Sequence, residues 1–318
     1  MQRYLQQGMA ILFCCLGFFS TGAMAWPNRP IEIVVGFAPG GGTDITARTL
    51  ATHLEKELGG SVVIVNKSGA SGAIGLAYVA RSKPDGHTLG MTNMPGLLTI
   101  PIEREAGYLP SDFTYLANLV RDPCAFSVSI NSPYKTLADL VAAARANPGK
   151  ISVSTSGIGT DDHLQMAFFE KATGTKLNHV PFNGSAPQRN AVFGGHTDVG
   201  GMNVGEAMPY NGINLRILAQ AAEVRSALAP DVPTFKEQGV DVVLASERGL
   251  VGPKGLPKDV QQKLEAALSK IAKNPEFIQQ IRSQFTELDY VPSEAWQARL
   301  ARADLELRAL WKTQRWAD

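Results

Sequence analysis

Glycine, serine and threonine gather in six short loops, each placed after a predicted strand. The loops are "GFAPGGGTD" (36–44), "NKSGASGAIG" (66–75), "TNMPG" (92–96), "STSGIGTDDH" (154–163), "PFNGSAPQ" (181–188) and "GGMNVGE" (200–206). Glycine lets the backbone approach a ligand closely, and a helix N-terminus presents unpaired N–H groups and a positive dipole end. Such a loop can hold a carboxylate, phosphate or sulfate. One such loop alone would indicate only a tight turn, but three in each half of the chain predict an anion site in a cleft.

Three side chains in these loops could do more than bind an anion. Asp44 could act as a general base, but a carboxylate at a helix start more often accepts backbone N–H bonds, and we expect that role. The hydroxyl of Thr43 could serve either the helix end or a ligand. His163 could face the cleft or be hydrogen-bonded inside its own lobe, and the sequence leaves both open.

The motifs of several enzyme classes are absent. "PGGGTD" lacks the lysine of a phosphate-binding P-loop, and "GIGTDD" has Asp162 where a dinucleotide fingerprint needs its third glycine. No serine stands in a G-x-S-x-G elbow, and the histidines show no metal-binding spacing. Cys124 is predicted to be a buried thiol rather than a nucleophile. We therefore expect no metal, no cofactor and no catalytic residue.

Short β-rich runs alternate with amphipathic stretches along most of the chain. Predicted strands cover 31–35, 62–66, 88–92, 115–120, 126–130, 150–154, 178–182, 197–201 and 215–220. Predicted helices cover 43–58, 136–146, 161–173 and 186–193. This alternation is typical of βαβ units, whose mostly parallel sheets are covered on both faces. Ligands of such sheets bind at the carboxyl ends of the strands, where the six loops lie.

The end of the chain is rich in helices, predicted over 257–274, 275–283 and 293–316. A helical tail of this kind packs back onto an earlier domain, which predicts two α/β lobes. Lobe 1 comprises residues 26–122 plus 247–318, and lobe 2 comprises residues 123–246. Two segments then cross between the lobes, near 120–124 and near 245–249.

The N-terminus has the pattern of a secretory signal peptide. An apolar run covers 9–19, and Ala23 and Ala25 form a small-residue cleavage pattern. The run is too short to span a bilayer, so we expect cleavage after Ala25 and export rather than a membrane anchor. Loss of residues 1–25 removes one positive charge and takes the formal net charge from +1 to about zero. A neutral chain offers no electrostatic basis for binding nucleic acid or anionic membranes.

The segment "RPIEIVVGFAPGGGTDITAR" (29–48) resembles the opening of the Bug proteins, the TctC-type extracytoplasmic solute receptors of tripartite tricarboxylate transporters. Similar later segments are "VVIVNKSGASGAIG", "SKPDGHTL", "TSGIGTDDHL", "HVPFNGSAP", "GGHTDVGGMN" and "ALAPDVPTFKEQG". The resemblance covers essentially the whole exported chain. It implies a two-lobed type II periplasmic binding-protein fold, a periplasmic location, a monomer, and delivery of a small organic carboxylate to a membrane permease without catalysis.

The resemblance also implies where the ligand lies. In that family, loops matching 37–44 and 69–72 hold one carboxylate of the ligand, and loops matching 156–160 and 184–186 hold its other end. With the neighbouring loop positions, the predicted ligand-binding residues are Phe37, Gly41, Gly42, Thr43, Asp44, Ala70, Ser71, Gly72, Thr92, Asn93, Ser156, Gly157, Thr160, His163, Gly184, Ser185, Ala186, Met202 and Asn203.

Four positions depart from the family pattern. Gly42 stands where proline is common, and Phe182-Asn183 stand where tyrosine and lysine are frequent. Met202 stands where many members carry an aspartate that can recognise a ligand amino group. The last departure argues against an amino acid ligand and for a simple or apolar-bodied carboxylate.

Two other functions stay open at this point. One is a secreted two-lobed enzyme, an isomerase or lyase with Asp44 or His163 as base, which the absence of a nucleophile–base or metal constellation disfavours. The other is a ligand-presenting partner of a membrane sensor kinase in place of a permease. For the receptor we hypothesise an open–closed equilibrium about the two crossings, with ligand contacts in both lobes only when closed.

Overall fold

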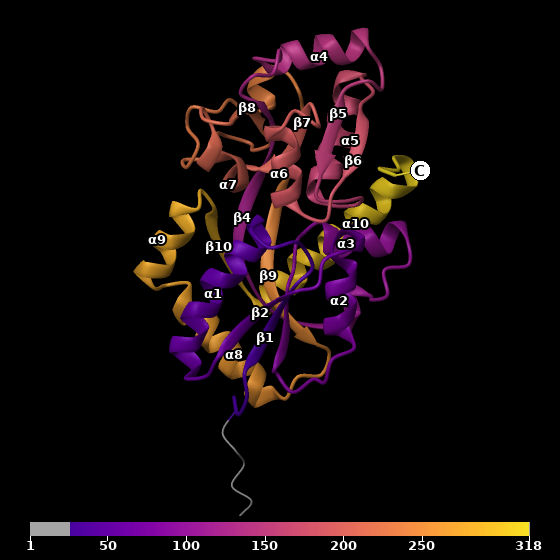
Figure 1. The fold of residues 1–318 in the computed structure, drawn as a ribbon. Coiled ribbons are helices and arrows are strands. Elements are labelled where there is room, and N and C mark those ends of the chain that lie inside the picture. The colour runs from indigo at the N-terminus through magenta and orange to yellow at the C-terminus, as the bar shows by residue number, and fades with distance from the viewer. Residues whose placement is uncertain (1–25, 318) are drawn as a thin grey trace, which may run out of the picture.

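The computed structural model describes residues 26–317, and the predicted signal peptide, residues 1–25, lies outside the described part. Figure 1 shows two lobes joined by the long strands β4 (Phe113–Ser129) and β9 (Ala245–Pro253). These two strands pair antiparallel, from Phe113 opposite Pro253 to Pro123 opposite Ala245. No helix within residues 26–317 is long and apolar enough to cross a membrane.

The sheet of lobe 1 has the strand order β2-β1-β3-β9-β4, and β10 (Glu287–Pro292) also pairs with β4. β1 (Ile31–Val35) runs parallel to β2 (Val62–Asn66) and to β3 (Thr88–Met91). Helices cover both faces of β1, because Ile33 packs in one apolar cluster and its neighbour Val34 packs in another. A strand buried on both faces has a continuous apolar run, which is what "IEIVV" shows.

Two groups of helices provide these clusters in lobe 1. One face of the sheet is covered by α1 (Gly42–Leu58), α8 (Lys258–Ile271) and α9 (Pro275–Ser283). The other face is covered by α2 (Ala73–Ala80), α3 (Gly96–Glu103) and α10 (Ser293–Thr313). The helical end of the chain therefore packs on the first lobe, as the sequence predicts.

Lobe 2 repeats the arrangement with the order β6-β5-β7-β4, and β8 (Leu215–Gln220) also pairs with β4. β5 (Ser152–Thr155) runs parallel to β6 (Asn178–Pro181) and β7 (Val199–Asn203). The helices of this lobe are α4 (Leu137–Ala146), α5 (Asp161–Thr173), α6 (Ser185–Phe193) and α7 (Val204–Ala207). Short 3₁₀ helices are η1 (Ala70–Gly72), η2 (Pro110–Asp112), η3 (Met208–Tyr210) and η4 (Lys236–Gln238).

The structure confirms the two-lobed α/β fold and corrects two details of the sequence analysis. The predicted strands at 115–120 and 126–130 are one strand, β4, which continues through Pro123. β9 and β10 were not predicted as strands. Parallel pairing holds for the outer strands of each lobe, while β4 and β9 add antiparallel pairs.

The partners of β4 change at the junction of the lobes. Its residues up to Pro123 pair with β9, and those from Cys124 pair with β7 and β8. The lobe boundaries at 122/123 and 246/247 remain a prediction, and this change of partners supports them.

Candidate functional site

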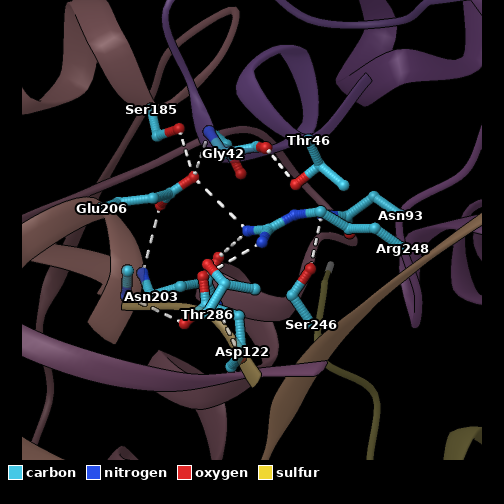
Figure 2. A network of polar contacts seen from close by, with 12 residues as sticks. Gly42, Thr46, Asn93, Asp122, Ser185, Asn203, Glu206, Ser246, Arg248 and Thr286 are labelled. Carbon is cyan, nitrogen blue, oxygen red and sulfur yellow. Dashed lines mark hydrogen bonds and ion pairs between the residues drawn. The ribbon is translucent and has the colours of Figure 1, made fainter. Parts of the chain in front are cut away.

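The loop after β1 leads directly into α1, whose N-cap residue is Gly41. Glycine has no side chain to cap the helix, so the first-turn N–H groups need other acceptors. The N–H of Gly42 donates to Glu206 Oε1 at 2.9 Å, across the cleft from lobe 1 to lobe 2. Figure 2 shows this contact, with Ser185 Oγ donating to the same oxygen at 2.6 Å.

The carboxylate of Asp44 accepts hydrogen bonds at the start of α1 and does not line the cleft. Its Oδ2 accepts from the N–H of Gly40 and from Arg48 Nε, both at 2.9 Å, and its Oδ1 accepts from Asn66 Nδ2 at 2.8 Å. Burial acts to raise the pKa of Asp44, but the hydrogen bonds from Arg48, Gly40 and Asn66 outweigh it and lower the pKa below the ordinary value. A stabilised, fully bonded carboxylate is a poor base, in line with the structural role expected for it.

A small pocket of about 10 Å³ lies where the loops of the two lobes meet. Its lining residues are Phe37, Gly41, Thr43, Asn93, Ser156, Asp161, Ser185, Asn203 and Glu206. A second, more apolar pocket adjoins it and shares Phe37 and Asn93. The second pocket is completed by Gly36, Ser71, Gly72, Leu76, Met91, Gly96, Leu97 and Ile100. Both lobes therefore contribute to the first pocket.

The lobes touch each other around these pockets. The N–H of Ala38 donates to the carbonyl of Asn183 at 2.9 Å, and Arg104 Nη2 donates to the carbonyl of Ile158 at 3.3 Å. Gly157 has φ +138°, and a Cβ there would lie 2.4 Å from Ser71 Oγ, so this contact between lobes requires glycine. The structure is a closed arrangement of the two lobes.

The predicted ligand-binding residues fall into three groups. Those that line a pocket are Phe37, Gly41, Thr43, Ser71, Gly72, Asn93, Ser156, Ser185 and Asn203. Those at the contact between the lobes are Gly42, Gly157, Gly184 and Ala186, with Ala70 preceding Ser71 in η1. Those outside both groups are Asp44, Thr92, Thr160, His163 and Met202.

The polar members of the third group are bonded inside the protein. Thr92 Oγ1 donates to the carbonyl of Gly249 at 3.0 Å, and Thr160 Oγ1 donates to the carbonyl of Gly157 at 2.7 Å. His163 Nδ1 accepts from the N–H of Gly159 at 3.1 Å. Of the two alternatives left open for His163, the structure therefore shows the histidine held within its lobe.

The His163 ring stacks on His179 with a centroid distance of 4.3 Å. Burial, together with the nearby positive charge that His179, Arg104 and Lys176 would carry, lowers the pKa of His163 to about 3. Burial lowers the pKa of His179 to about 4. Both rings are therefore neutral at physiological pH.

Met202 does not face the ligand pocket. Its side chain is fully buried in an apolar cluster with Ala125, Val192 and Val204. Successive side chains of a strand point to opposite faces, and in β7 it is the next residue, Asn203, that lines the pocket. The prediction that Met202 contacts the ligand is therefore not supported. The inference drawn from Met202 against an amino acid ligand has lost its basis.

Two residues of the first pocket were missed by the sequence analysis, namely Asp161 and Glu206. The missed residues of the second pocket are Gly36, Leu76, Met91, Gly96, Leu97 and Ile100. Asp161 is the first residue of α5, and its Oδ2 accepts from Asn203 Nδ2 at 2.8 Å and from the Cys124 thiol at 3.6 Å. Both acids lie inside glycine loops that the sequence marked, "STSGIGTDDH" and "GGMNVGE". The sequence shows that both residues are acidic, but nothing in the neighbouring residues shows which acids of these loops face the cleft.

Arg248 of β9 lies behind the pocket and is fully buried. Its Nη1 donates to Asp122 Oδ2 at 3.0 Å, its Nη2 donates to Asn203 Oδ1 at 2.9 Å, and Glu206 Oε1 lies 3.6 Å from Nη2 (Figure 2). Asp122, Asp161, Asp162 and Glu206 are buried, and Arg248 is the only lysine or arginine buried with them in residues 26–317.

Burial dominates the protonation of these carboxyl groups. It raises the pKa of Asp122 to about 7, although the positive charge of Arg248 acts to lower it. Burial also raises the pKa of Asp161, and it raises that of Asp162 well above the ordinary value together with the charge of Asp161. The acids and histidines of residues 26–317 form no group that could hold a metal ion.

With this geometry established, comparison with known proteins assigns the family. The model of the TctC family, described as "Tripartite tricarboxylate transporter family receptor", matches residues 46–314. This chain belongs to the TctC family. The predicted resemblance and the role of a solute receptor are thereby confirmed.

Relatives of this TctC receptor match over most of its length. The "UPF0065 protein in gbd 5'region" of Cupriavidus necator is 34% identical over 298 residues, which cover 91% of this chain and 90% of the relative. The periplasmic binding protein BugD has a TM-score of 0.86 with 30% identity, covering 91% of this chain and 98% of BugD. An R. palustris protein solved with adipate has the same TM-score with 29% identity, covering 91% of this chain and 98% of its own.

Proposed function

We propose that this TctC receptor captures a small organic carboxylate between its two lobes and delivers it to a tripartite tricarboxylate-type permease. The observation that carries the proposal is the shared pocket, lined by Gly41 and Thr43 from lobe 1 and by Ser156 and Ser185 from lobe 2. A ligand that touches both lobes favours the closed arrangement over the open one. The adipate bound to a relative supports a carboxylate as the ligand.

The start of three helices at the pocket explains how an anion is held without a basic side chain. Gly41 is the N-cap of α1, Asp161 is the first residue of α5, and Ser185 is the first residue of α6. The first-turn N–H groups of a helix have no partner within it and carry the positive end of the dipole. We propose that these N–H groups, with the hydroxyls of Thr43 and Ser156, bind the carboxylate, while the hydroxyl of Ser185 donates to Glu206.

We propose that the ligand leaves the cleft chemically unchanged. The enzyme alternative relied on Asp44 or His163 as base. Asp44 is bonded to Gly40, Arg48 and Asn66, and His163 accepts from Gly159, so both are committed to contacts within their lobes. Neither side chain lines the pocket.

We propose that this receptor acts in the periplasm, which its membership of a family of periplasmic binding proteins supports. We propose that export removes residues 1–25 by cleavage after Ala25. We further propose that the exported chain is a monomer, because one ligand pocket is completed by two lobes of the same chain. A sensor kinase in place of the permease stays the second candidate partner.

Calorimetry across a panel of mono- and dicarboxylates tests the function, with small-angle scattering as a second readout. We expect saturable binding of at least one carboxylate and a decrease in the radius of gyration on binding. Thr43→Val removes a pocket hydroxyl and should weaken binding about fivefold to tenfold. Thr52→Val is the matched control, because Thr52 is exposed on the same helix. Absence of binding by every carboxylate, or binding without compaction, would contradict the proposal.

A further inference from the structure

The residues that follow α10 pack on lobe 1 through Trp316. Trp316 is 4% exposed, and its ring lies against that of Trp311 with a centroid distance of 4.5 Å. Its Nε1 donates to Oε2 of Glu103, the last residue of α3, at 3.0 Å. A buried indole N–H needs an acceptor of this kind, and the bond in turn fixes the position of the Glu103 carboxyl group.

The Glu103 carboxyl group also orients Arg104, the next residue. Its Oε1 accepts from Arg104 Nη1. Arg104 Nη2 donates to the carbonyl of Ile158 in lobe 2 and to Ser71 Oγ in lobe 1, each at 3.3 Å. One oxygen of Glu103 therefore holds the indole, and the other holds the guanidinium that reaches across the cleft. Because the guanidinium is already oriented, its contact with lobe 2 costs less side-chain entropy.

Two further hydrogen bonds join the lobes on this side of the cleft. Thr99 Oγ1 of α3 donates to the carbonyl of Gly159, and Lys171 Nζ of α5 donates to Gln314 Oε1, just after α10. In Figure 1 the yellow end of α10 rises from lobe 1 to the level of β6 in lobe 2. The loop that receives the contacts from α3, residues 156–160, begins with Ser156, which lines the first pocket.

We infer that Trp316, Glu103 and Arg104 form an interlobe clasp, which stabilises the closed arrangement and thereby raises the affinity for the ligand. The inference rests on the proposed carboxylate-receptor function and adds a determinant of its affinity. None of the three residues lines a pocket, so they act as positioning residues. An open arrangement loses the bond between Arg104 and Ile158. Removal of this bond therefore lowers the population of the closed form, and the affinity falls in proportion.

Arg104→Met tests the clasp in two measurements. In calorimetry with the carboxylate of the panel that binds most tightly, the affinity should fall about fivefold to tenfold, as for a lost hydrogen bond to a charged group. Small-angle scattering without ligand should show a larger radius of gyration than for wild type. Arg81→Met is the matched control, because Arg81 Nη2 donates to the carbonyl of Gly107 at 3.1 Å within lobe 1, and it should change neither quantity.

The outcomes separate the clasp from the proposed function. Equal affinity and an equal radius of gyration for Arg104→Met and wild type would overturn the clasp and leave the carboxylate-receptor function intact. Absence of binding by every carboxylate would refute the proposed function, and the comparison of the two radii without ligand would then decide the clasp.

A double-mutant cycle tests whether Trp316 acts through Arg104. Trp316→Phe keeps an aromatic ring but removes the N–H that donates to Glu103. It should weaken binding about threefold in the wild-type background and have no further effect in Arg104→Met. An equal effect in both backgrounds would overturn the inclusion of Trp316 in the clasp. Arg104→Met by itself keeps the inference testable if Trp316→Phe does not fold.

Discussion

The N–H of Gly42 donates a hydrogen bond of 2.9 Å to Glu206 Oε1, which joins the first turn of α1 in lobe 1 to α7 in lobe 2. The helix N-terminus that the sequence predicts for an external anion thus also holds an anion of the chain itself. A Cβ at residue 42 would lie 2.7 Å from Glu206 Oε1 and 2.6 Å from Arg248 Nη2, so this contact needs glycine. The departure at Gly42 from the proline common in the family is explained by this close approach, and proline would also lack the N–H.

Glu206→Gln should shift the unliganded protein toward an open arrangement. The substitution keeps the size of the side chain but removes the negative charge at the start of α1 and beside Arg248, which should cost the closed form about 1 kcal/mol. Small-angle scattering should show a larger radius of gyration than for wild type. As a control, Glu294→Gln removes a first-turn acid of α10 and should leave the radius of gyration unchanged. Equal compactness of Glu206→Gln and wild type would show that the contact does not hold the lobes together.

Arg248→Met should destabilise the fold strongly. Arg248 and Asp122 are both 0% exposed, so loss of the guanidinium leaves Asp122 and Glu206 buried without their cation. The free energy of unfolding should fall by about 3–5 kcal/mol in denaturant titrations. As a control, Arg308→Met breaks an exposed ion pair with Asp304 and should change the free energy of unfolding by less than about 1 kcal/mol. Similar losses of unfolding free energy in the two variants would contradict the view that burial makes the loss of Arg248 costly.

His163→Asn should change how stability depends on pH. The pKa of His163 is about 3 in the folded protein against an ordinary 6.5, so the unfolded chain takes up a proton first as the pH falls. The contribution of His163 is complete above pH 6.5 and is lost as the pH falls toward 3. Relative to the variant, the wild-type free energy of unfolding should lose about 1.4 kcal/mol per pH unit in this window.

The measurement is denaturant unfolding at a series of pH values. His196→Asn is the control, because His196 is exposed, and it should keep the wild-type slope. Comparing each variant with wild type cancels the opposite contribution of buried acids such as Asp122, whose raised pKa lowers stability as the pH rises toward 7. Identical slopes for wild type and His163→Asn would refute a neutral buried His163.

Cys124 should resist thiol reagents in the native protein. It is the only cysteine after residue 25, it is fully buried, and burial with the neighbouring charge of Asp161 raises its pKa. Both effects suppress the reactive thiolate. Labelling with a chromogenic disulfide should therefore proceed only as fast as the protein opens, and a bound ligand should slow it further because Asp161 contacts the thiol and lines the pocket. Immediate labelling of folded protein would contradict this placement.

The sequence by itself determined the local elements and their order. The run "IEIVV" and the glycines after it located β1, its loop and the start of α1, because strand propensity, glycine turns and helical periodicity act within about ten residues. The six glycine loops followed from the same local signals. Their gathering at one cleft followed from the rule that ligands bind at the carboxyl ends of parallel strands.

Only the tertiary structure decided which side chains face the cleft. Asp161 and Asp162 are adjacent acids, as Met202 and Asn203 are adjacent on β7, and one member of each pair lines the pocket. Strand register and helix rotation set that choice, and both depend on packing against distant segments. β4 likewise continues through Pro123 because β9 pairs with it there, more than a hundred residues later in the chain. Long-range pairing of this kind leaves no local signal in the sequence.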